Sequence, residues 1–321
     1  MITIFLRFIK RDLYPWIFAI ITVILWGVHG PAGRYLVLHG VSPFFVFSTR
    51  LWIGTSVFCL YLVYKKQFCL SKTPNLPLLQ RILESWGLFW GEEFRKIIVI
   101  ALIGLVFNTI VFHLALLYLP GTYVMIMENL APIFVFIASL VIYGIKPKKF
   151  ELLALFISFI GIFCIILGKD RSIGIEQDFY LGVLFCLLAA ISFAGYILLS
   201  VDLMKEYKND PLKIICFLFK IFLISAIVCT PFLLFTKAKP LTPLQWFWII
   251  EMGIFQSGIA YIFWNFAMAH LRANTMSLLF MLTILTTSIN EILFMGLKIN
   301  FYLVLGGLAI CSSGYWIALS K

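Results

Sequence analysis

Residues 123–136 read Tyr-Val-Met-Ile-Met-Glu-Asn-Leu-Ala-Pro-Ile-Phe-Val-Phe, which places Glu128, Asn129 and Pro132 inside an otherwise apolar run. In a helix that begins near Gly121 and rises about 1.5 Å per residue, Glu128 lies about 12 Å from the start. In a membrane-spanning helix this depth is close to the middle of the bilayer, where a lipid-facing carboxylate costs several kcal/mol. Glu128 is therefore expected to face a protein interior or a water-filled cavity.

The composition of the whole chain supports this interpretation. Of the 321 residues, 63% are hydrophobic and 12% are charged, and the mean hydropathy is +1.05. Soluble domains are about 45–50% apolar and about 25% charged, so a soluble fold of this size would not bury so much apolar surface. The apolar runs lack the alternation of β-barrel strands. We therefore expect an all-α polytopic membrane protein.

The distribution of charge and the spacing of cysteines and histidines argue against some classes of partner. The net charge is +11, but the basic residues collect between the apolar runs, which is typical of membrane topology rather than of nucleic-acid binding. The seven cysteines lie mostly inside spans without paired metal spacing, and the four histidines are scattered. No nucleic acid, metal or cofactor is expected.

Ten apolar segments are expected to cross the membrane. Their approximate bounds are 16–38, 43–64, 97–118, 121–143, 150–168, 179–203, 212–235, 244–270, 274–296 and 300–319. The glycines and proline at 27–33 predict a kink in the first span, and no small-residue cleavage site follows it, so we expect it to be retained. Within the polar linker 65–96, residues 78–86 have helical spacing and are expected to lie in the membrane interface.

Basic residues indicate the orientation of the chain. With a cytoplasmic amino terminus, seventeen lysines and arginines fall on the cytoplasmic side and five on the other, while Arg34, Arg50 and Lys220 lie inside spans. Because basic loops stay cytoplasmic, both termini and the linker are predicted to face the cytoplasm. The expected location is the cell (inner) membrane.

The two halves of the chain repeat at an offset of 152 residues. Shifting residues 99–150 by this offset places Ala115 on Ala267, Leu119 on Leu271, Gly144 on Gly296 and Lys146 on Lys298 without a gap. We interpret residues 1–170 and 171–321 as two five-helix repeats. Five is an odd number, so the repeats must point in opposite directions, and transporters with inverted repeats bind substrate between them at mid-membrane.

Several motifs occur in the order found in one transporter family. They are Leu25-Trp26-Gly27 in the first span, Arg50 shortly after Ser42-Pro43, Ala131-Pro132 in the fourth span, and Gly258, Tyr261, Trp264 and Ala267 in the eighth. The set resembles the EamA-type ten-helix branch of the drug/metabolite transporter (DMT) superfamily. The usual Gly-Glu at the end of spans four and nine is absent, and Ile284 replaces the second proline. The resemblance implies two five-helix halves around a central cavity, with spans five and ten peripheral.

Polar and aromatic residues inside the spans are the candidates for substrate binding. They are Glu128, Asn129, Trp26, His29, Arg50, Asn108, Phe112, Tyr261 and Trp264. Glu128 is expected to bind a cationic group or a coupling proton, the alternative being a structural pair with Arg50 or an amide. Asn129 is either a substrate hydrogen-bond partner or a helix–helix contact.

The other candidates also have two interpretations. Arg50 is a candidate to bind a substrate carboxylate. It lies about 10 Å below the outer end of its span, however, so the alternative is that its side chain snorkels to the membrane surface. The aromatic residues, with His29 and Asn108, suit a box that stacks on a ring or holds a cation, or they are ordinary packing in a chain that is 17% aromatic. His113 and His270 are candidate proton carriers, and Glu291 is expected to be interfacial.

The hypothesis that follows is a secondary transporter of an amino acid or amino-acid derivative, working by alternating access. No phosphate-binding loop is present, so coupling to protons or to a counter-substrate is expected rather than ATP hydrolysis. An exchanger of S-adenosylmethionine and S-adenosylhomocysteine in a host-dependent bacterium is the named alternative. A membrane-embedded enzyme is the alternative of a different class, disfavoured because no catalytic cluster is visible. We expect a monomer or homodimer in the lipid bilayer.

Overall fold

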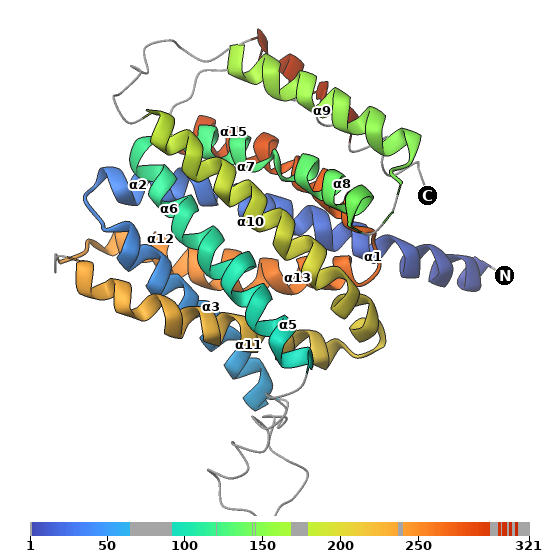
Figure 1. Cartoon of the computed structure of the whole chain (residues 1–321), viewed down its shortest axis with the longest axis horizontal. Helices are drawn as coiled ribbons and strands as arrows, with labels where there is room; N and C mark the ends of the chain where they lie inside the picture. The colour runs from blue at the N-terminus through green and yellow to red at the C-terminus, as the bar shows by residue number, and fades with distance from the viewer. Residues whose placement is uncertain are drawn as a thin grey trace, which may run out of the picture.

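The structure is a computed structural model that describes residues 2–64, 92–119, 121–142, 144, 146–167, 179–236, 240–295 and parts of 301–313. Every regular element in these ranges is helical (Figure 1). Within them, eight segments are long and apolar enough to cross a membrane. Helix α9 (Lys149–Leu167) coincides with the fifth expected span, and helical pieces between 301 and 313 coincide with the tenth. The all-α polytopic fold is confirmed, and the count of ten is supported approximately.

The first two spans follow their predicted positions. The first is divided into α1 (Ile2–Trp26) and α2 (His29–Leu38), so the predicted kink is confirmed. A Cβ atom on Gly27 would lie 2.5 Å from the Thr286 Cβ, which shows that only a glycine lets the later helix approach this break. The second span is the single helix α3 (Pro43–Tyr64).

The remaining spans are mostly divided into shorter helices. They comprise α5 (Glu92–Val99), the π-helix η2 (Ile100–Phe107) and α6 (Asn108–Tyr118); α7 (Gly121–Glu128) and α8 (Ala131–Val141); α10 (Phe179–Glu206) with η3 (Tyr207–Asn209); α11 (Pro211–Cys229) with η4 (Thr230–Phe235); α12 (Pro243–Glu251), the π-helix η5 (Met252–Ile259) and α13 (Ala260–Met268); and α14 (Ala273–Phe280) with α15 (Thr283–Met295). The predicted interfacial segment 78–86 lies outside the described residues.

Local sequence explains where several of these helices begin. Pro43, Pro211 and Pro243 occupy the first helical position, where a missing N–H costs nothing. Before Pro243, Thr242 accepts a hydrogen bond from the backbone of Gln245, whose side chain accepts one from the Thr242 backbone, 2.9 Å away. This capping box fixes the start of α12.

Element bounds in the two parts of the chain coincide at the offset of 152. Helix α7 (121–128) corresponds to α14 (273–280), and η2 (100–107) corresponds to η5 (252–259). The starts of α8 and α15, at residues 131 and 283, differ by the same number. The duplication and the domain division stay predictions, and these shared bounds support them.

Two spans, α7 with α8 and α14 with α15, are interrupted by a short break and are called the broken spans below. They lie side by side and run in opposite directions. Helix α7 packs against α15 and α8 packs against α14, while α10 crosses α6, α7 and α8. Helix α9 lies at the edge of the bundle (Figure 1), as the resemblance implies for the fifth span. Large apolar side chains such as Ile137, Phe156 and Leu293 are exposed on the outside, which is expected of a surface that contacts lipid.

Candidate substrate site

Three charged side chains lie at similar depth on three different helices. Arg50 and Glu128 each lie seven residues after the start of α3 and α7, and Glu251 lies eight residues after the start of α12. At about 1.5 Å per residue, these positions are about 10–12 Å from the helix starts. Arg50 interacts electrostatically with both carboxylates, which places the three charges in one region of the bundle.

Arg50 is buried and does not reach the surface, so the snorkelling interpretation is wrong. Arg50 is 3% exposed, and its Nη1 atom is hydrogen-bonded to the Nε2 atom of His29. A guanidinium only donates, so the imidazole accepts through an unprotonated Nε2. The imidazole also stacks on Phe112, with ring centroids 4.4 Å apart and an interplanar angle of 25°. Arg50 Nε has no partner although it is buried, which leaves a charged donor available to a ligand.

Glu128 is also held by a neutral partner. Its Oε1 atom accepts a hydrogen bond of 3.0 Å from Asn108 Nδ2, which also donates to the Ala189 carbonyl at 3.0 Å. Glu128 is the last residue of α7 and Asn108 is the first residue after the π-helix η2, so both lie where regular hydrogen bonding changes. Glu128 and Arg50 interact electrostatically but form no ion pair with each other.

The predicted aromatic box divides into two groups. Trp26 lies 5.3 Å from Tyr261 and 5.0 Å from Trp264 between ring centroids, whereas His29 and Phe112 stack on each other beside Arg50. The Nε1 atom of Trp264 is buried without a hydrogen-bond partner, although most buried polar groups have one. A donor therefore remains free inside the aromatic group.

The structure adds two aromatic residues that the sequence did not single out. Phe193 and Phe280 lie 4.3 Å apart between centroids, and each lies 5.8 Å from the ring of Trp26. In a chain rich in phenylalanine no local pattern distinguishes them, because their role depends on how α10 and α14 pack against α1.

Asn129 faces the neighbouring broken helix. Its Nδ2 atom donates to the Met125 carbonyl at 2.7 Å and to Thr283 Oγ1 at 2.9 Å, so it joins the break between α7 and α8 to the break between α14 and α15. These contacts match the helix–helix interpretation of Asn129, and only its Oδ1 atom is left without a partner.

Glu251 was missed among the candidates. Its Oε2 atom accepts a hydrogen bond of 2.8 Å from Gln256 Nε2, and the Gln256 carbonyl accepts one of 3.0 Å from Trp26 Nε1. The criterion that singled out Glu128, a carboxylate inside an apolar span, also finds Glu251. In the part of the chain that the structure describes, no group of three or more His, Cys, Asp and Glu residues is placed to bind a metal ion.

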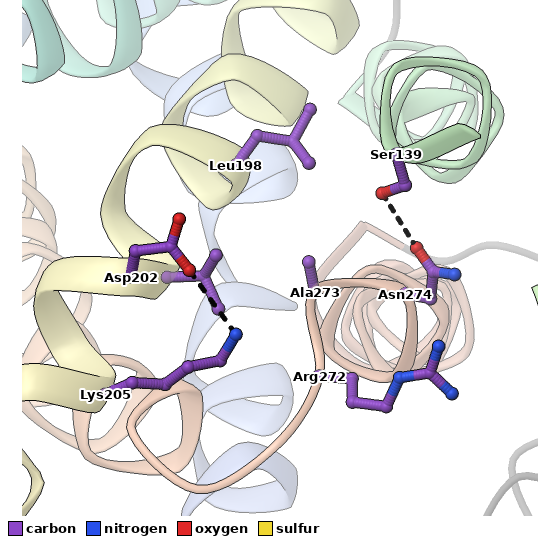
Figure 2. A pocket seen from close by; sticks show the side chains of 8 residues that line it. Ser139, Leu198, Asp202, Lys205, Arg272, Ala273 and Asn274 are labelled. Atoms are coloured by element: carbon purple, nitrogen blue, oxygen red, sulfur yellow. Dashed lines mark hydrogen bonds and ion pairs between the residues drawn. The ribbon is translucent and has the colours of Figure 1, made fainter. Parts of the chain in front are cut away.

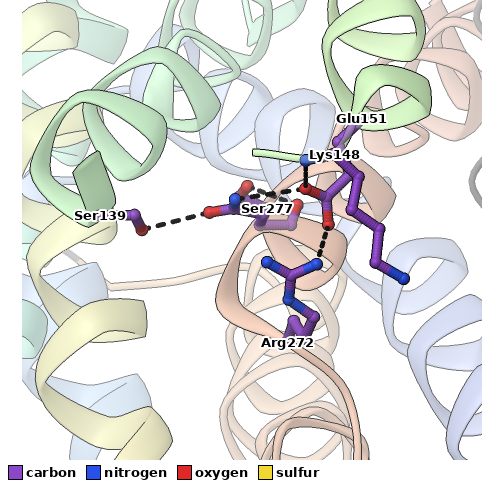
Figure 3. A network of polar contacts seen from close by, with 6 residues as sticks. Ser139, Lys148, Glu151, Arg272 and Ser277 are labelled. Carbon is purple, nitrogen blue, oxygen red and sulfur yellow. Dashed lines mark hydrogen bonds and ion pairs between the residues drawn. The ribbon is translucent and has the colours of Figure 1, made fainter. Parts of the chain in front are cut away.

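A polar network ties α8, α9 and α14 together at the end where α14 begins (Figure 3). Ser139 Oγ donates to Asn274 Oδ1 at 3.1 Å, and Asn274 Nδ2 donates to Glu151 at 3.4 Å. Arg272 pairs with the other Glu151 oxygen at 3.3 Å. Beside it lies a cavity of about 70 Å³, whose lining includes Ser139, Arg272 and the Asp202–Lys205 ion pair (Figure 2).

A second contact joins α7 and α15 at the end where α7 begins. The Thr122 backbone N–H donates to Glu291 Oε1 at 3.0 Å, and Glu291 is 8% exposed. The expectation that Glu291 is interfacial stays a prediction, and the structure adds that its side chain accepts a hydrogen bond inside the bundle. At the offset of 152, Thr122 corresponds to Asn274 and Ser139 corresponds to Glu291. The two contacts between the broken helices thus use equivalent positions at opposite ends.

Comparisons with known proteins agree with this architecture. The model of the EamA-like transporter family matches the chain twice, over residues 14–167 and 180–319. An uncharacterized transporter of Archaeoglobus fulgidus is 26% identical over 255 residues, which cover 76% of this chain and 85% of that protein. One crystal structure shares the fold with a TM-score of 0.71 and 14% identity, covering 97% of this chain and 96% of the other. The chain therefore belongs to the EamA-like transporter family, within the drug/metabolite transporter superfamily.

Proposed function

We propose that the protein is a secondary transporter of a small amphipathic metabolite that carries both a carboxylate and an amine, as an amino acid does. The observation that carries this proposal is the separation of two buried opposite charges. Arg50 is held by His29 and Glu128 by Asn108, although direct pairing is the usual way to offset the cost of burying charge. A zwitterionic ligand between them would give each side chain a partner of opposite charge. Its carboxylate would bind Arg50 and its ammonium group would bind Glu128.

The aromatic group provides for the apolar part of such a ligand. Trp26 packs against Tyr261 and Trp264, and Tyr261 interacts electrostatically with Arg50 and Glu128. Aromatic surfaces of this kind stack on rings or hold cations. The buried, unpartnered Trp264 Nε1 is a hydrogen-bond donor for an acceptor on the ligand. This combination supports an amino acid with a large side chain or S-adenosylmethionine over a small, fully polar solute.

Alternating access is supported by the contacts at the two ends of the broken helices. Thr122 contacts Glu291 at one end, and Ser139 contacts Asn274 at the other. In a protein built from inverted repeats, equivalent positions lie at opposite membrane faces, so breaking one contact while keeping the other opens one face at a time. From the distribution of basic residues, the Asn274 end is the cytoplasmic one, and both termini face the cytoplasm of the cell (inner) membrane.

The test is uptake into liposomes that contain the purified protein. Labelled aromatic, basic and small amino acids, nucleosides and S-adenosylmethionine are compared with and without a pH gradient. We expect uptake of at least one amine-bearing carboxylate, and loss of that uptake in Glu128→Gln and Arg50→Gln. Glu206→Gln, which changes an exposed carboxylate on α10, is the matched control and should transport normally. Normal uptake by Glu128→Gln would refute the assignment of the ammonium site.

A further inference from the structure

A carboxylate and an amide form a pair at the start of the π-helix η5. Glu251 is the last residue of α12, and Gln256 is five residues later, so the widened turn of a π-helix brings their side chains within 2.8 Å. Gln256 is 1% exposed, while Glu251 is partly exposed. The pair therefore has one member buried in the interior and one whose side chain is partly exposed.

One atom of this pair has no partner. Gln256 Nε2 donates to the carboxylate, but the amide oxygen Oε1 is buried and accepts nothing. A buried acceptor without a hydrogen bond destabilises the folded protein, so its presence needs a physical reason. The Gln256 backbone is held in place because its carbonyl accepts from Trp26 Nε1, which leaves rotation of the amide as the available motion.

Protonation of Glu251 would satisfy that atom. An ionised carboxylate only accepts, so it selects the amide orientation in which Nε2 faces it. A protonated carboxyl is also a donor, and rotation of the amide by half a turn lets Gln256 Oε1 accept a hydrogen bond from its O–H, while Nε2 moves to the position that Oε1 leaves. The two protonation states thus select two amide orientations, each with a hydrogen bond between the same pair of residues.

The surroundings contain one charge that bears directly on the pair. The elements packed against α12 and η5 include α1, α2, α3 and α13. From residue 13 onward, where the side chains are described, their titratable residues are Tyr14, His29, Arg34, Tyr35, His39, Arg50, Cys59, Tyr61, Tyr64 and Tyr261. Of these, Arg50 interacts electrostatically with Glu251, and it interacts with Glu128 as well. A ligand or proton that changes one carboxylate therefore changes the field that Arg50 applies to the other.

We propose that Glu251 and Gln256 form a proton-binding site, distinct from the Glu128 site for the substrate amine, through which a proton gradient drives transport. The coupling part of this proposal rests on the proposed transport function. The proton comes from water at the partly exposed carboxylate, binds one Glu251 oxygen, and is released from the same oxygen to water when the other face opens. Arg50 links the two sites, because the carboxylate of the substrate and the charge of Glu251 compete for the same guanidinium.

The first experiment detects the proton itself and needs no substrate. The purified protein in liposomes is titrated with acid and base while infrared difference spectra record the carbonyl stretch of protonated carboxyl groups. We expect one such band to be absent in Glu251→Gln and present in the control Glu206→Gln. In Gln256→Leu the band should remain and shift, because the carboxyl loses its amide acceptor. If Glu251 had only a structural role, the wild-type spectra would contain no titrating band that Glu251→Gln removes.

The outcomes separate this proposal from the proposed function. Spectra of Glu251→Gln identical to those of the wild-type protein would overturn the proton site even if transport is established. Should Glu251→Gln fail to fold, an unshifted band in Gln256→Leu would overturn it. In the uptake panel, Glu251→Gln should keep exchange of labelled for unlabelled compound while its stimulation by a pH gradient falls to about none. Retained stimulation would refute coupling through this site.

Discussion

The substitution Gly30→Ala should open the end of the bundle at which α7 begins. A Cβ atom on Gly30 would lie 2.9 Å from the Gly121 carbonyl oxygen and 2.9 Å from Met125 Cγ. The oxygen belongs to the backbone of α7, so it moves only if α2 and α7 separate. Overpacking of this kind costs about 1–3 kcal/mol in the packed state. The strain disappears when this end opens, so the ratio of open to closed protein should rise roughly 5- to 150-fold.

Cysteine labelling measures that ratio. Thr122 is fully buried at this end and its hydroxyl has no hydrogen-bond partner, so Thr122→Cys in a background without other cysteines places a nearly isosteric probe behind the closed contact. Its backbone bond to Glu291 is kept. The rate of reaction with a membrane-impermeant maleimide should rise in the Gly30→Ala protein by the same factor as the open population.

Gly195→Ala is the matched control. It also adds one methyl group to a helix glycine, but the nearest atom to its Cβ would be Ile103 Cγ2 at 3.4 Å, which is an ordinary contact. Labelling at Thr122→Cys should be unchanged by it. Equal labelling rates in the Gly30→Ala and wild-type backgrounds, with both proteins folded, would show that the α2–α7 contact does not control access at this end.

Two further predictions concern the other end and the aromatic group. Asn274→Ala removes the amide that joins Ser139 to Glu151 and should lower the free energy of unfolding by about 1–3 kcal/mol, measured by thermal unfolding in detergent. Lys205→Ala, which breaks an exposed ion pair, should change it by less than about 1 kcal/mol, and equal losses would contradict the assigned network. Trp264→Phe removes an unpartnered donor and leaves a small cavity, because the Trp264 side chain is fully buried. Uptake should fall in the folded variant, and normal uptake would contradict a ligand-binding role.

Hydropathy and proline positions predicted most of the span boundaries, and they explain one of the two broken helices. Pro132 has no N–H to donate to the Glu128 carbonyl four residues earlier, so the helix is interrupted where α7 ends. The break between α14 and α15 has Ile284 at the corresponding position and no local cause in the sequence. There Thr283 Oγ1 donates to the Phe280 carbonyl at 2.7 Å and accepts from Asn129, so hydrogen bonds accompany this break where proline causes the break between α7 and α8.

The charged residues of the candidate site are recognisable in the sequence, but their partners are not. A charged side chain inside an apolar span is visible in the sequence, and the cost of burying it predicts that it faces the interior. Which partner it meets depends on the packing of one span on another, as α6 on α7 places Asn108 beside Glu128. The sequence therefore allowed a direct Arg50–Glu128 pair, whereas the structure gives each charge its own neutral partner.

Glu128 and Glu251 lie at positions that are not equivalent in the two halves of the chain, and this allows two similar halves to bind a ligand in one orientation. At the offset of 152, Glu128 corresponds to Phe280, Glu251 corresponds to Val99, and Gln256 corresponds to Gly104. Each predicted repeat thus contributes one of these two carboxylates, but at positions that the offset does not relate. Under the proposed alternating access, the equivalent helix breaks and end contacts would let movements of the backbone exchange the two faces. The charges would not exchange, so the proposed zwitterion would keep the same carboxylate and amine partners whichever face is open.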